Sequence, residues 1–336
     1  MKKAKKIIND PKKVVAELLE GFLDAHKGKI VAIEGSDGRA LVKAHVPADK
    51  VALLTGGGSG HEPIFPGFIG EGMADGSACG EIFAAPAPDI VLKTTQGISR
   101  GKGVIYLYNN YAGDIMNFDI ASEIAAEEGH EVRTVLNYDD VASAPPEQKE
   151  ERRGIAGIVF LLKIAGAVTS TGASLAEAVR VTCKARDNVR SMGVAIGAGS
   201  IPETGEPTFE LPADEIEIGM GGHGEPGVLR TKMMPADALV ELMMEKILPD
   251  LPFQAGDEIC VLVNDLGATT MMELLIVYRK VHRILKEKGI KVHDTLIGSL
   301  VTCQEMAGFS LSLFKLDAEL KRYYDMPASS LGLTKR

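Results

Sequence analysis

Hydrophobic residues follow two patterns that alternate along the chain. In the first pattern they recur at three- and four-residue steps, which is typical of helices that bury one face. These segments are 11–27, 89–100, 236–247, 269–288 and 317–324. The second pattern is a short run rich in aliphatic residues, which is typical of strands. These runs are 29–33, 51–54, 104–108, 131–137, 215–218, 258–263, 291–297 and 309–316. The alternation of helices and strands predicts an α/β fold.

Local signals place the remaining helices. Residues 154–169 are apolar almost all round, which predicts a helix buried on every side. Ser174 and Glu177 have the spacing of a capping box and predict a helix that runs to about residue 192. Asn117 is predicted to cap a further helix, which ends before Gly129.

Two polar segments are predicted to be irregular. Residues 63–80 are rich in glycine and turn-forming residues, so we expect a loop that walls or covers a site. Residues 138–153 contain two prolines and the charge run EQKEERR, which is typical of a solvated loop.

The length of 336 residues predicts two domains, at about 150 residues per domain. Glycine and proline become denser near residues 185–205, and we therefore divide the chain into domains 1–190 and 191–336. Each is expected to be an α/β domain with a mixed sheet flanked by helices.

Composition narrows the classes of function. Hydrophobic residues make up 45% and charged residues 25% of the chain, as in ordinary globular proteins. The net charge of −9 argues against nucleic acid or an anionic membrane as the main partner. We expect neither a signal peptide, because the basic start runs into no apolar region, nor a membrane span. The four cysteines are far apart and form no CxxC pair, which favours reduced thiols in a cytoplasm and no zinc site.

Two glycine-rich stretches carry the candidate chemistry. The strand 215–218 leads into GMGGHGEPG at 219–227, in which five of nine residues are glycine, and the strand 51–54 leads into GGGSGHEP at 56–63. Glycine allows a backbone to approach a ligand closely, and α/β proteins bind ligands at the carboxyl ends of strands. His61 and His223 lie in these stretches, and histidine can be an acid, a base or a nucleophile near neutral pH. A third strand, 104–108, ends in polar residues that include Asp114. The sequence therefore predicts one site for a small polar carbonyl compound between glycine-rich loops at strand ends.

Other interpretations of these stretches are open from the residues alone. Either loop could be a plain tight turn with a solvated histidine. Neither carries the lysine and hydroxyl residue of a P-loop or a complete dinucleotide fingerprint, so the chain is expected to lack its own nucleotide site. Metal binding by His61, His223 and Asp114 is less favoured, because no two of them have helical or hairpin spacing.

Covalent chemistry is the alternative to metal binding. An imidazole nitrogen can add to a ketone or aldehyde carbon and give a hemiaminal, so such a site would select carbonyl compounds over polyols. A second histidine and an aspartate could then act as bases on a neighbouring hydroxyl.

Five motifs in order resemble one known family. They are TGGGSGHEP at 55–63, GEIFAAPAPD at 80–89, NYAGDIMNF at 110–118, RRGIAGIVFLLKIAGA at 152–167 and GGHGEPG at 221–227. Together they resemble the dihydroxyacetone-binding K subunit of dihydroxyacetone kinase, and the similarity runs from INDP at 8–11 to the C-terminus.

The resemblance implies roles for particular residues. His223 is expected to bind the substrate carbonyl covalently as a hemiaminal. His61 and Asp114 are expected to act as base and hydrogen-bond partner at the hydroxyl that accepts phosphate. The substrate-binding set implied by the family motifs is Gly58, Ser59, Gly60, His61, Asn109, Asp114 and His223.

The resemblance also implies partners. The family fold is two α/β domains in a homodimer, and the nucleotide, ADP or ATP with Mg²⁺, sits on a separate L domain or subunit. This chain ends at Arg336, so we expect an L partner and no cofactor or metal bound by the chain itself. In the phosphotransferase-dependent branch, a multidomain phosphocarrier with an M subunit recharges the nucleotide on that partner.

Two departures leave the substrate open. Many family members have a lysine where this chain has Asn109, and an aliphatic residue where it has Gly222. A related short ketose such as a tetrulose is therefore an alternative substrate. A non-catalytic, ketose-sensing coactivator is a second alternative, but such a paralogue would lose the catalytic pair, and this chain keeps His61 and Asp114.

Overall fold

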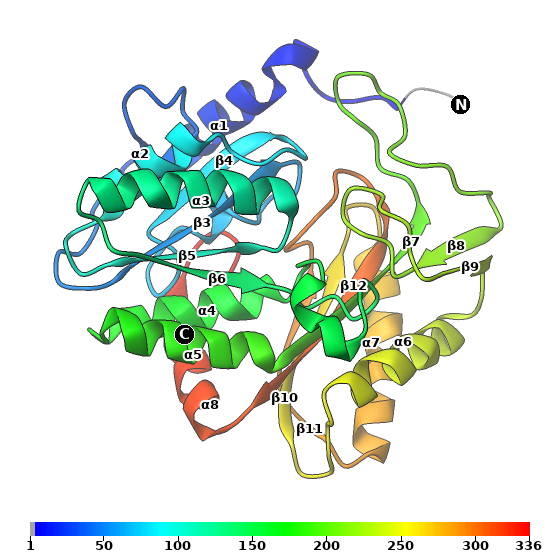
Figure 1. The fold of residues 1–336 in the computed structure, drawn as a ribbon. Coiled ribbons are helices and arrows are strands. Elements are labelled where there is room, and N and C mark those ends of the chain that lie inside the picture. The colour runs from blue at the N-terminus through cyan, green and yellow to red at the C-terminus, as the bar shows by residue number, and fades with distance from the viewer. Residues whose placement is uncertain (1–3) are drawn as a thin grey trace. The chain divides into compact units, whose positions relative to one another are not determined.

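The computed structural model describes residues 4–336 and contains two six-stranded mixed sheets flanked by helices (Figure 1). This confirms the predicted α/β class. Each sheet belongs to one compact unit. The His61 unit comprises Lys5–Leu136, Leu161–Lys184 and Arg322–Arg336, and the His223 unit comprises mainly Asn137–Phe160 and Ala185–Lys321.

These units differ from the predicted domains 1–190 and 191–336, because the chain passes between them more than once. Residues 137–160 fall before the predicted boundary but belong to the His223 unit, and residues 322–336 fall after it but belong to the His61 unit. One cut along the sequence cannot separate units that share the chain in this way.

The sheet of the His61 unit has the strand order β1-β2-β4-β3-β5-β6. The three strands β4, β3 and β5 run parallel; β2 pairs antiparallel with β4, and β1 pairs antiparallel with β2. The strands are β1 (Ile30–Ala32), β2 (Ala40–Lys43), β3 (Ala52–Ser59), β4 (Gly76–Ile82), β5 (Val104–Asn109) and β6 (Val132–Asn137). A short hairpin of β13 (Ala328–Ser329) and β14 (Thr334–Lys335) lies near the C-terminus.

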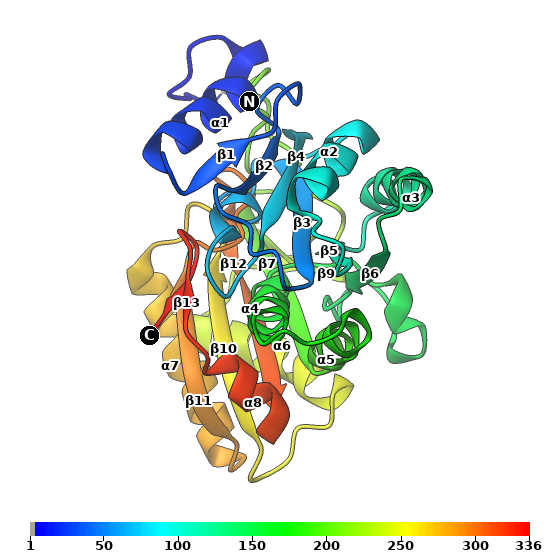
Figure 2. The ribbon, with the colours of Figure 1, turned by 90° about the vertical axis from the view of Figure 1, so that its left-hand side faces the viewer.

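Helices cover both faces of this sheet. Helices α2 (Pro88–Ile98) and α3 (Ala112–Glu127) pack on one face through a core that includes Val91, Tyr106 and Phe118, and α1 (Val14–Ala25) packs against a separate cluster (Figure 2). The other helices in or beside this unit are η1 (Pro11–Lys13), η2 (Pro66–Phe68), α4 (Ile158–Ser170), α5 (Leu175–Asp187) and α8 (Ala318–Tyr324).

The sheet of the His223 unit has the order β11-β10-β12-β7-β8-β9. Strands β10 and β11 are parallel and the other neighbours are antiparallel. The elements are η3 (Pro146–Glu151), β7 (Val189–Gly197), β8 (Glu215–Ile218), β9 (Leu229–Lys232), α6 (Ala236–Asp250), β10 (Glu258–Asp265), α7 (Met271–Glu287), β11 (Lys291–Gly298) and β12 (Ala307–Leu316). Helices α6 and α7 bury their apolar faces in its core.

Six of the strands within residues 4–336 were not predicted: β2, β4, β7, β9, β13 and β14. Strand β4 lies largely within the segment expected to be a loop, and β7 begins where a helix was expected to continue to residue 192. Both are buried over most of their length, so neither shows the alternation of polar and apolar residues that marks a half-exposed strand. A Cβ atom at Gly76 would lie 2.9 Å from Thr94 Cγ2, which shows why β4 is rich in small residues.

The expected cap of α3 is also wrong. Helix α3 begins at Ala112, and Asn117 lies inside it, where its side-chain amide donates to the Pro86 carbonyl at 2.9 Å. The chain enters the helix from Tyr111, whose backbone is extended. The predicted stop near Gly129 is confirmed, since α3 ends at Glu127 and Gly129 has a φ of 86°.

The charged segment 138–153 is solvated only in part: residues 145–148, 150 and 151 are exposed, but both ends of the segment are not. Asp139, Asp140 and Arg152 are all buried. The Asp139 carboxylate accepts hydrogen bonds from the backbone amides of Ile155 at 2.7 Å and Gly157 at 2.8 Å, just before α4. The charges at the two ends of this segment are therefore matched inside the fold, which a local count of charged residues cannot reveal.

The predicted all-apolar helix is confirmed as α4, which is buried from Ile158 to Thr169. It carries one charged residue, Lys163, whose ammonium donates to the Tyr323 carbonyl at 2.8 Å. Within residues 4–336, no helix combines the length and hydropathy needed to cross a membrane.

Replacing Lys163 with methionine is expected to remove a rise in stability at alkaline pH. Burial, with the nearby charge of Lys335, lowers the pKa of Lys163 from 10.5 to about 8. Between these values the unfolded chain still holds the proton that the folded chain has lost, so stability increases with pH, by at most about 1.4 kcal/mol per pH unit. Urea unfolding of both proteins, at neutral pH and near the upper end of this window, measures the effect. The same free-energy difference between the two proteins at both pH values would contradict it.

Candidate functional site

The carboxyl ends of β4, β3 and β5 meet at one edge of the sheet in the His61 unit. Ser59 pairs with Ile82 across β3 and β4, and Thr55 pairs with Leu107 across β3 and β5. Because the strands are parallel, the segments that follow them leave the sheet at the same edge. These segments carry His61, Phe83 and Asp114, so this edge is a candidate active site.

The glycines before His61 lie in β3 itself and not in a loop after it. A Cβ atom at Gly56 would lie 2.5 Å from the Ala78 carbonyl oxygen, and one at Gly58 would lie 2.7 Å from the Ala84 amide nitrogen. The glycines are therefore required by close neighbours of the strand. The loop starts at Gly60, which has a φ of 101°, a conformation that favours glycine.

His61 is held at the start of this loop. The residue is 8% exposed, and its ring lies 4.9 Å from the Phe83 ring at an angle of 44°. The Gly60 amide donates to the Glu62 carboxylate, with distances of 3.1 and 3.0 Å to its two oxygens. Burial raises the pKa of Glu62 in spite of the backbone amides that bind it. The imidazole is thus fixed by a turn and by an aromatic neighbour.

Asp114 lies in the first turn of α3, where the helix dipole favours a negative charge. The turn that leads into the helix contains Asn109, which is half-buried at the end of β5. Burial, together with the charges of Asp119 and Asp114, raises the pKa of the Tyr108 hydroxyl and keeps it protonated.

The segment between β4 and α2 contacts both parts of this edge. The Phe83 ring lies beside the His61 ring at a tilt, and a Cβ atom at Gly113 would lie 3.6 Å from Ala85 Cβ. Asn117 binds the Pro86 carbonyl on the same segment. The structure therefore brings the elements that carry His61 and Asp114 to one edge of the sheet.

The other residues predicted to bind substrate lie beside His61. Ser59 is buried, and its hydroxyl donates to the Gly80 carbonyl at 2.8 Å. The backbone explains why Gly58 and Gly60 are glycines: Gly58 has no room for a Cβ atom, and Gly60 has a positive φ. Their contacts with a substrate, and that of Asn109, stay predictions.

His223 belongs to the His223 unit, in the loop that follows β8. Gly219 and Gly224 have φ values of 81° and 90°, so two glycines give this loop its shape. The His223 side chain is 28% exposed. A partly exposed ring on a loop of this kind is accessible to a small molecule.

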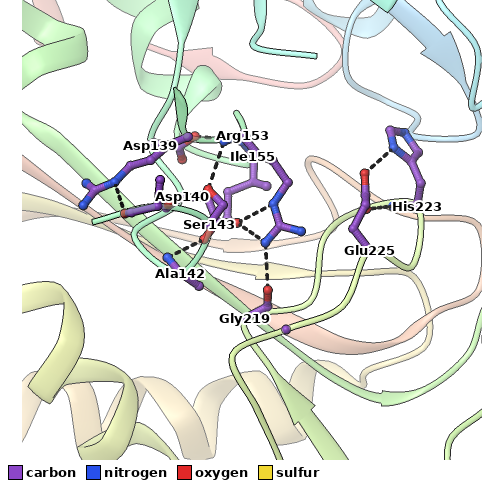
Figure 3. Close-up of polar contacts among 12 residues, drawn as sticks. Asp139, Asp140, Ala142, Ser143, Arg153, Ile155, Gly219, His223 and Glu225 are labelled. Atoms are coloured by element: carbon purple, nitrogen blue, oxygen red, sulfur yellow. Dashed lines mark hydrogen bonds and ion pairs between the residues drawn. The ribbon is translucent and has the colours of Figure 1, made fainter. Parts of the chain in front are cut away.

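Glu225 is the principal partner of His223 (Figure 3). Its carboxylate accepts a hydrogen bond from the His223 amide at 2.9 Å, and it lies 3.0 Å from Nδ1 of the ring. Burial alone would raise the pKa of Glu225, but the hydrogen bond and the charge of His223 outweigh it and lower the pKa to about 2. An ionised carboxylate can only accept, so Nδ1 carries the proton, and in the neutral ring Nε2 keeps its lone pair.

Arg153 holds the start of the loop through Gly219 (Figure 3). Its guanidinium donates to the Gly219 carbonyl at 2.9 Å and to Asp140 at 2.8 Å. Burial raises the pKa of Asp140 to about 6, although the charge of Arg153 acts in the opposite direction. A Cβ atom at Gly221 would lie 2.5 Å from Arg153 Nη1, so the loop needs glycine to pass this side chain.

Sequence reasoning missed Glu225, Arg153 and Asp140 as parts of the site. Glu225 lies in the motif GGHGEPG, two residues after the histidine, and this spacing was the available signal. Arg153 is the second residue of another shared motif, but the charge run that contains it was assigned to solvent.

No group of three or more His, Cys, Asp or Glu side chains within residues 4–336 is arranged to hold a metal ion. All four cysteines are free.

Comparisons with known proteins identify relatives of this chain. Residues 20–332 match the family that is described as the Dak1 domain. The PTS-dependent dihydroxyacetone kinase 2 dihydroxyacetone-binding subunit DhaK of Listeria innocua is 40% identical over 327 residues, which cover 97% of this chain and 98% of that protein. D-erythrulose kinase of Mycolicibacterium smegmatis is 38% identical, and the match covers 97% of this chain and 56% of that protein.

Solved structures show the same relationship. The dihydroxyacetone kinase of C. freundii, in complex with AMP-PNP and Mg²⁺, matches with a TM-score of 0.90 and 30% identity, over 99% of this chain and 61% of that one. The dihydroxyacetone kinase operon co-activator DhaQ matches with a TM-score of 0.89 and 29% identity, over 95% of this chain and 98% of that one. Because the family match and the L. innocua relative both span most of its length, the chain belongs to the Dak1 family of dihydroxyacetone kinase subunits.

Proposed function

We propose that this chain is the substrate-binding subunit of a dihydroxyacetone kinase and that His223 captures the ketose covalently. The observation that carries the proposal is the His223–Glu225 pair. Glu225 fixes the Nδ1 proton, so Nε2 of the neutral ring presents a lone pair as a nucleophile. The name of the L. innocua relative, which is 40% identical, supports the choice of ketose.

The covalent step is an addition. The Nε2 lone pair forms a bond to the carbonyl carbon, and the π electrons of the carbonyl move to its oxygen, which takes up a proton. The ring then carries one proton too many, and it loses the proton on Nδ1 toward the Glu225 carboxylate, 3.0 Å away. Proton exchange with solvent completes a neutral hemiaminal and restores the ionised Glu225.

His61 and Asp114 would act on the hydroxyl that accepts phosphate. One accepts the proton of the hydroxyl and the other holds it by a hydrogen bond, which suits two groups at the carboxyl ends of adjacent parallel strands. Phosphoryl transfer depends mainly on positioning and on stabilisation of charge, so this chain would position the acceptor.

The donor would come from a partner. We propose that an L subunit carries ADP or ATP with Mg²⁺, that a phosphocarrier recharges it in a PTS-dependent system, and that this chain forms a homodimer in the cytoplasm. The PTS-dependent name of the L. innocua relative supports this choice of donor.

Two alternatives have specific support. A tetrulose substrate is favoured by the erythrulose kinase relative at 38% identity and by Asn109 and Gly222, which depart from the pattern of the dihydroxyacetone enzymes. A coactivator role is favoured by the DhaQ structure at 29% identity. The chain retains His61 and Asp114, and we therefore place the kinase first.

The test separates capture from transfer. The protein is incubated with dihydroxyacetone, erythrulose or glycerol and desalted rapidly, and intact mass spectrometry with peptide mapping then locates any adduct. An adduct of ketose mass on the peptide that contains His223, absent with glycerol, supports the proposal, and its relative occupancy ranks the ketoses. Absence of any adduct, together with no ketose phosphorylation in the presence of an L subunit, would contradict it.

Asp114→Asn is expected to keep the adduct and to lower the rate of phosphorylation by roughly 10²- to 10⁴-fold, the usual contribution of a positioned acid or base. The amide retains a similar shape but accepts no proton. Asp119→Asn is the matched control, since Asp119 is an exposed aspartate of the same helix. Wild-type turnover in Asp114→Asn would remove Asp114 from the catalytic machinery, and loss of the adduct would make it a binding residue.

A further inference from the structure

A cavity lies at the edge of the sheet in the His61 unit that is opposite the candidate active site. Its volume is about 490 Å³, within the range of pockets that hold small molecules. Four segments that are separate in the sequence form it: the turn between α1 and β1, the end of β2, the loop at 69–71, and the C-terminal stretch at 329–331. The mutual backbone hydrogen bonds of Glu71 and Ser329, at 3.1 and 2.9 Å, join the last two.

Strand directions separate this cavity from the candidate active site. Strand β2 is antiparallel to β4, and Val42 pairs with Gly76 at the start of β4. The end of β2, and with it Lys43, therefore lies at the amino-terminal edge of the parallel strands. His61 follows the carboxyl-terminal edge of the same strands.

The lining of the cavity is basic, although the chain as a whole has a net charge of −9. Four basic residues line it, with Glu71 as the one acidic residue: His26, Lys29, Lys43 and His45. Ile30, Ile69 and Leu331 add apolar surface. Among residues 4–336, neither the Lys29 ammonium nor the His45 ring makes an ion pair or a side-chain hydrogen bond.

Lys43 is the buried member of this group, with only 7% of its side chain exposed. Its ammonium lies 2.9 Å from the Glu71 carboxylate and 3.7 Å from Asp75. Asp75 is matched independently by Lys50 at 2.8 Å and by the Leu53 amide at 2.9 Å. The nearest counter-charge of Lys43 is therefore Glu71, whose side chain is 77% exposed and contacts no other cation within residues 4–336.

We propose that this cavity binds a small organic anion, whose carboxylate or phosphate group pairs with Lys43 and Lys29. The anion takes the place of the Glu71 side chain, which is free to swing into solvent without disturbing the backbone bonds to Ser329. Lysine ammonium groups bind carboxylates and phosphates as point charges, and a buried lysine binds them with less competition from water. The apolar part of the ligand lies against Ile30, Ile69 and Leu331.

The test uses inorganic phosphate and acetate as probes on the whole chain. Each is titrated at constant ionic strength, and backbone amide shifts are followed by NMR. We expect saturable shifts at Gly28, Gly70 and Ser330, which line the cavity. Stronger binding of phosphate would identify a phosphate-bearing ligand, and stronger binding of acetate would identify a carboxylate.

Substitutions in the cavity lining are expected to change the affinity for the anion in opposite directions. Lys29→Gln and Lys43→Met are each expected to weaken binding by roughly tenfold, because each removes a charge-assisted contact. Glu71→Gln is expected to strengthen binding severalfold, since it removes the competing carboxylate. Lys27→Gln is the matched control, an exposed lysine of the same turn that does not line the cavity.

Lys29→Gln and Glu71→Gln keep the test decisive if Lys43→Met fails to fold, because both side chains are exposed. Absence of saturable binding by either anion would overturn the proposal. Equal weakening in Lys29→Gln and Lys27→Gln would also overturn it, because the anions would then respond only to the general charge of the surface.

Discussion

His223→Ala is expected to abolish the ketose adduct and to lower kcat/KM for ketose phosphorylation by at least about 10³-fold, since the acceptor is no longer held in place. Alanine has no nucleophile to add to the carbonyl carbon. A ketose that is only hydrogen-bonded would reach the reactive position much less often. Mass spectrometry measures the adduct, and a coupled assay with an L subunit measures turnover.

The fold should tolerate this change. The His223 side chain is partly exposed on a loop, and Glu225, which lies 3.0 Å from its Nδ1, is two residues away in the same loop. We expect an unchanged circular dichroism spectrum. His282→Ala is the matched control, because His282 is an exposed histidine on α7 and should affect neither adduct nor turnover. A full adduct on His223→Ala would remove His223 from the covalent step.

Glu225→Gln should form the ketose adduct at a rate between those of the wild type and His223→Ala. Glutamine can still accept the Nδ1 hydrogen bond, but it cannot take the proton that the ring loses during addition. Groups that orient a functional histidine in metal sites are typically worth roughly 10- to 100-fold, and we expect a loss of that order in the rate of adduct formation. A purely structural role for Glu225 would slow the reaction equally for every ketose and leave its pH profile unchanged, whereas the proposed role changes the profile.

Asp250→Ala is expected to lower the free energy of unfolding by about 3–5 kcal/mol, the usual cost of removing one partner from a buried ion pair. Arg152 donates two hydrogen bonds to Asp250, at 2.8 and 2.6 Å, and Arg190 donates another. The side chains of Arg152 and Asp250 are only 1% and 6% exposed. The substitution would leave two guanidinium groups buried without their carboxylate, and would release the end of α6 from β7.

Asp237→Ala is the control for this prediction. Asp237 lies at the start of the same helix and pairs with Arg279, but both side chains are 40% exposed or more. We expect a change below about 1 kcal/mol, as for other surface ion pairs. Urea unfolding at neutral pH measures both variants. Similar losses in the two would contradict the buried role of Asp250.

Acid provides an independent check on Asp250. Burial would raise its pKa, but the hydrogen bonds from Arg152 and Arg190 outweigh burial and lower it below 3.8. The stabilisation from a depressed carboxyl is present above that ordinary value and is lost as the pH falls through the folded value. Asp250→Ala should therefore lose less stability than the wild type when the solution is acidified to this range.

Local patterns allowed much of the fold to be predicted. Strand β8 was predicted at residues 215–218 and has those bounds, and α6 and α7 were placed within a few residues of their observed ends. Strand β8 alternates glutamate and isoleucine, and the two helices are long, so the period of the apolar residues in each element reports which face packs in the core. Two strands that are buried over most of their length, β4 and β7, were missed. Strand β7 shows no regular alternation of polar and apolar residues, and the glycines in and around β4 are typical of a loop.

The candidate residues were found because polar side chains follow buried strands. His61, Asp114 and His223 all stand after a predicted strand, and the shared motifs of the Dak1 family pointed to the same positions. The roles of these residues stay proposals. What the sequence determined by itself is therefore the class of fold, the family, and the short list of residues that could carry the chemistry.

The tertiary structure alone decided which charges meet. Arg152 and Asp250 are 98 positions apart, and Arg153 reaches Gly219 over 66. From the sequence alone a run of charged residues is predicted to be exposed to solvent. An ion pair depends on distance in space and not on distance along the chain, so only the folded structure shows which of these charges are paired. The same applies to the glycines before His61, which look like a loop but lie in β3, since only the packed neighbours show how little room the strand has.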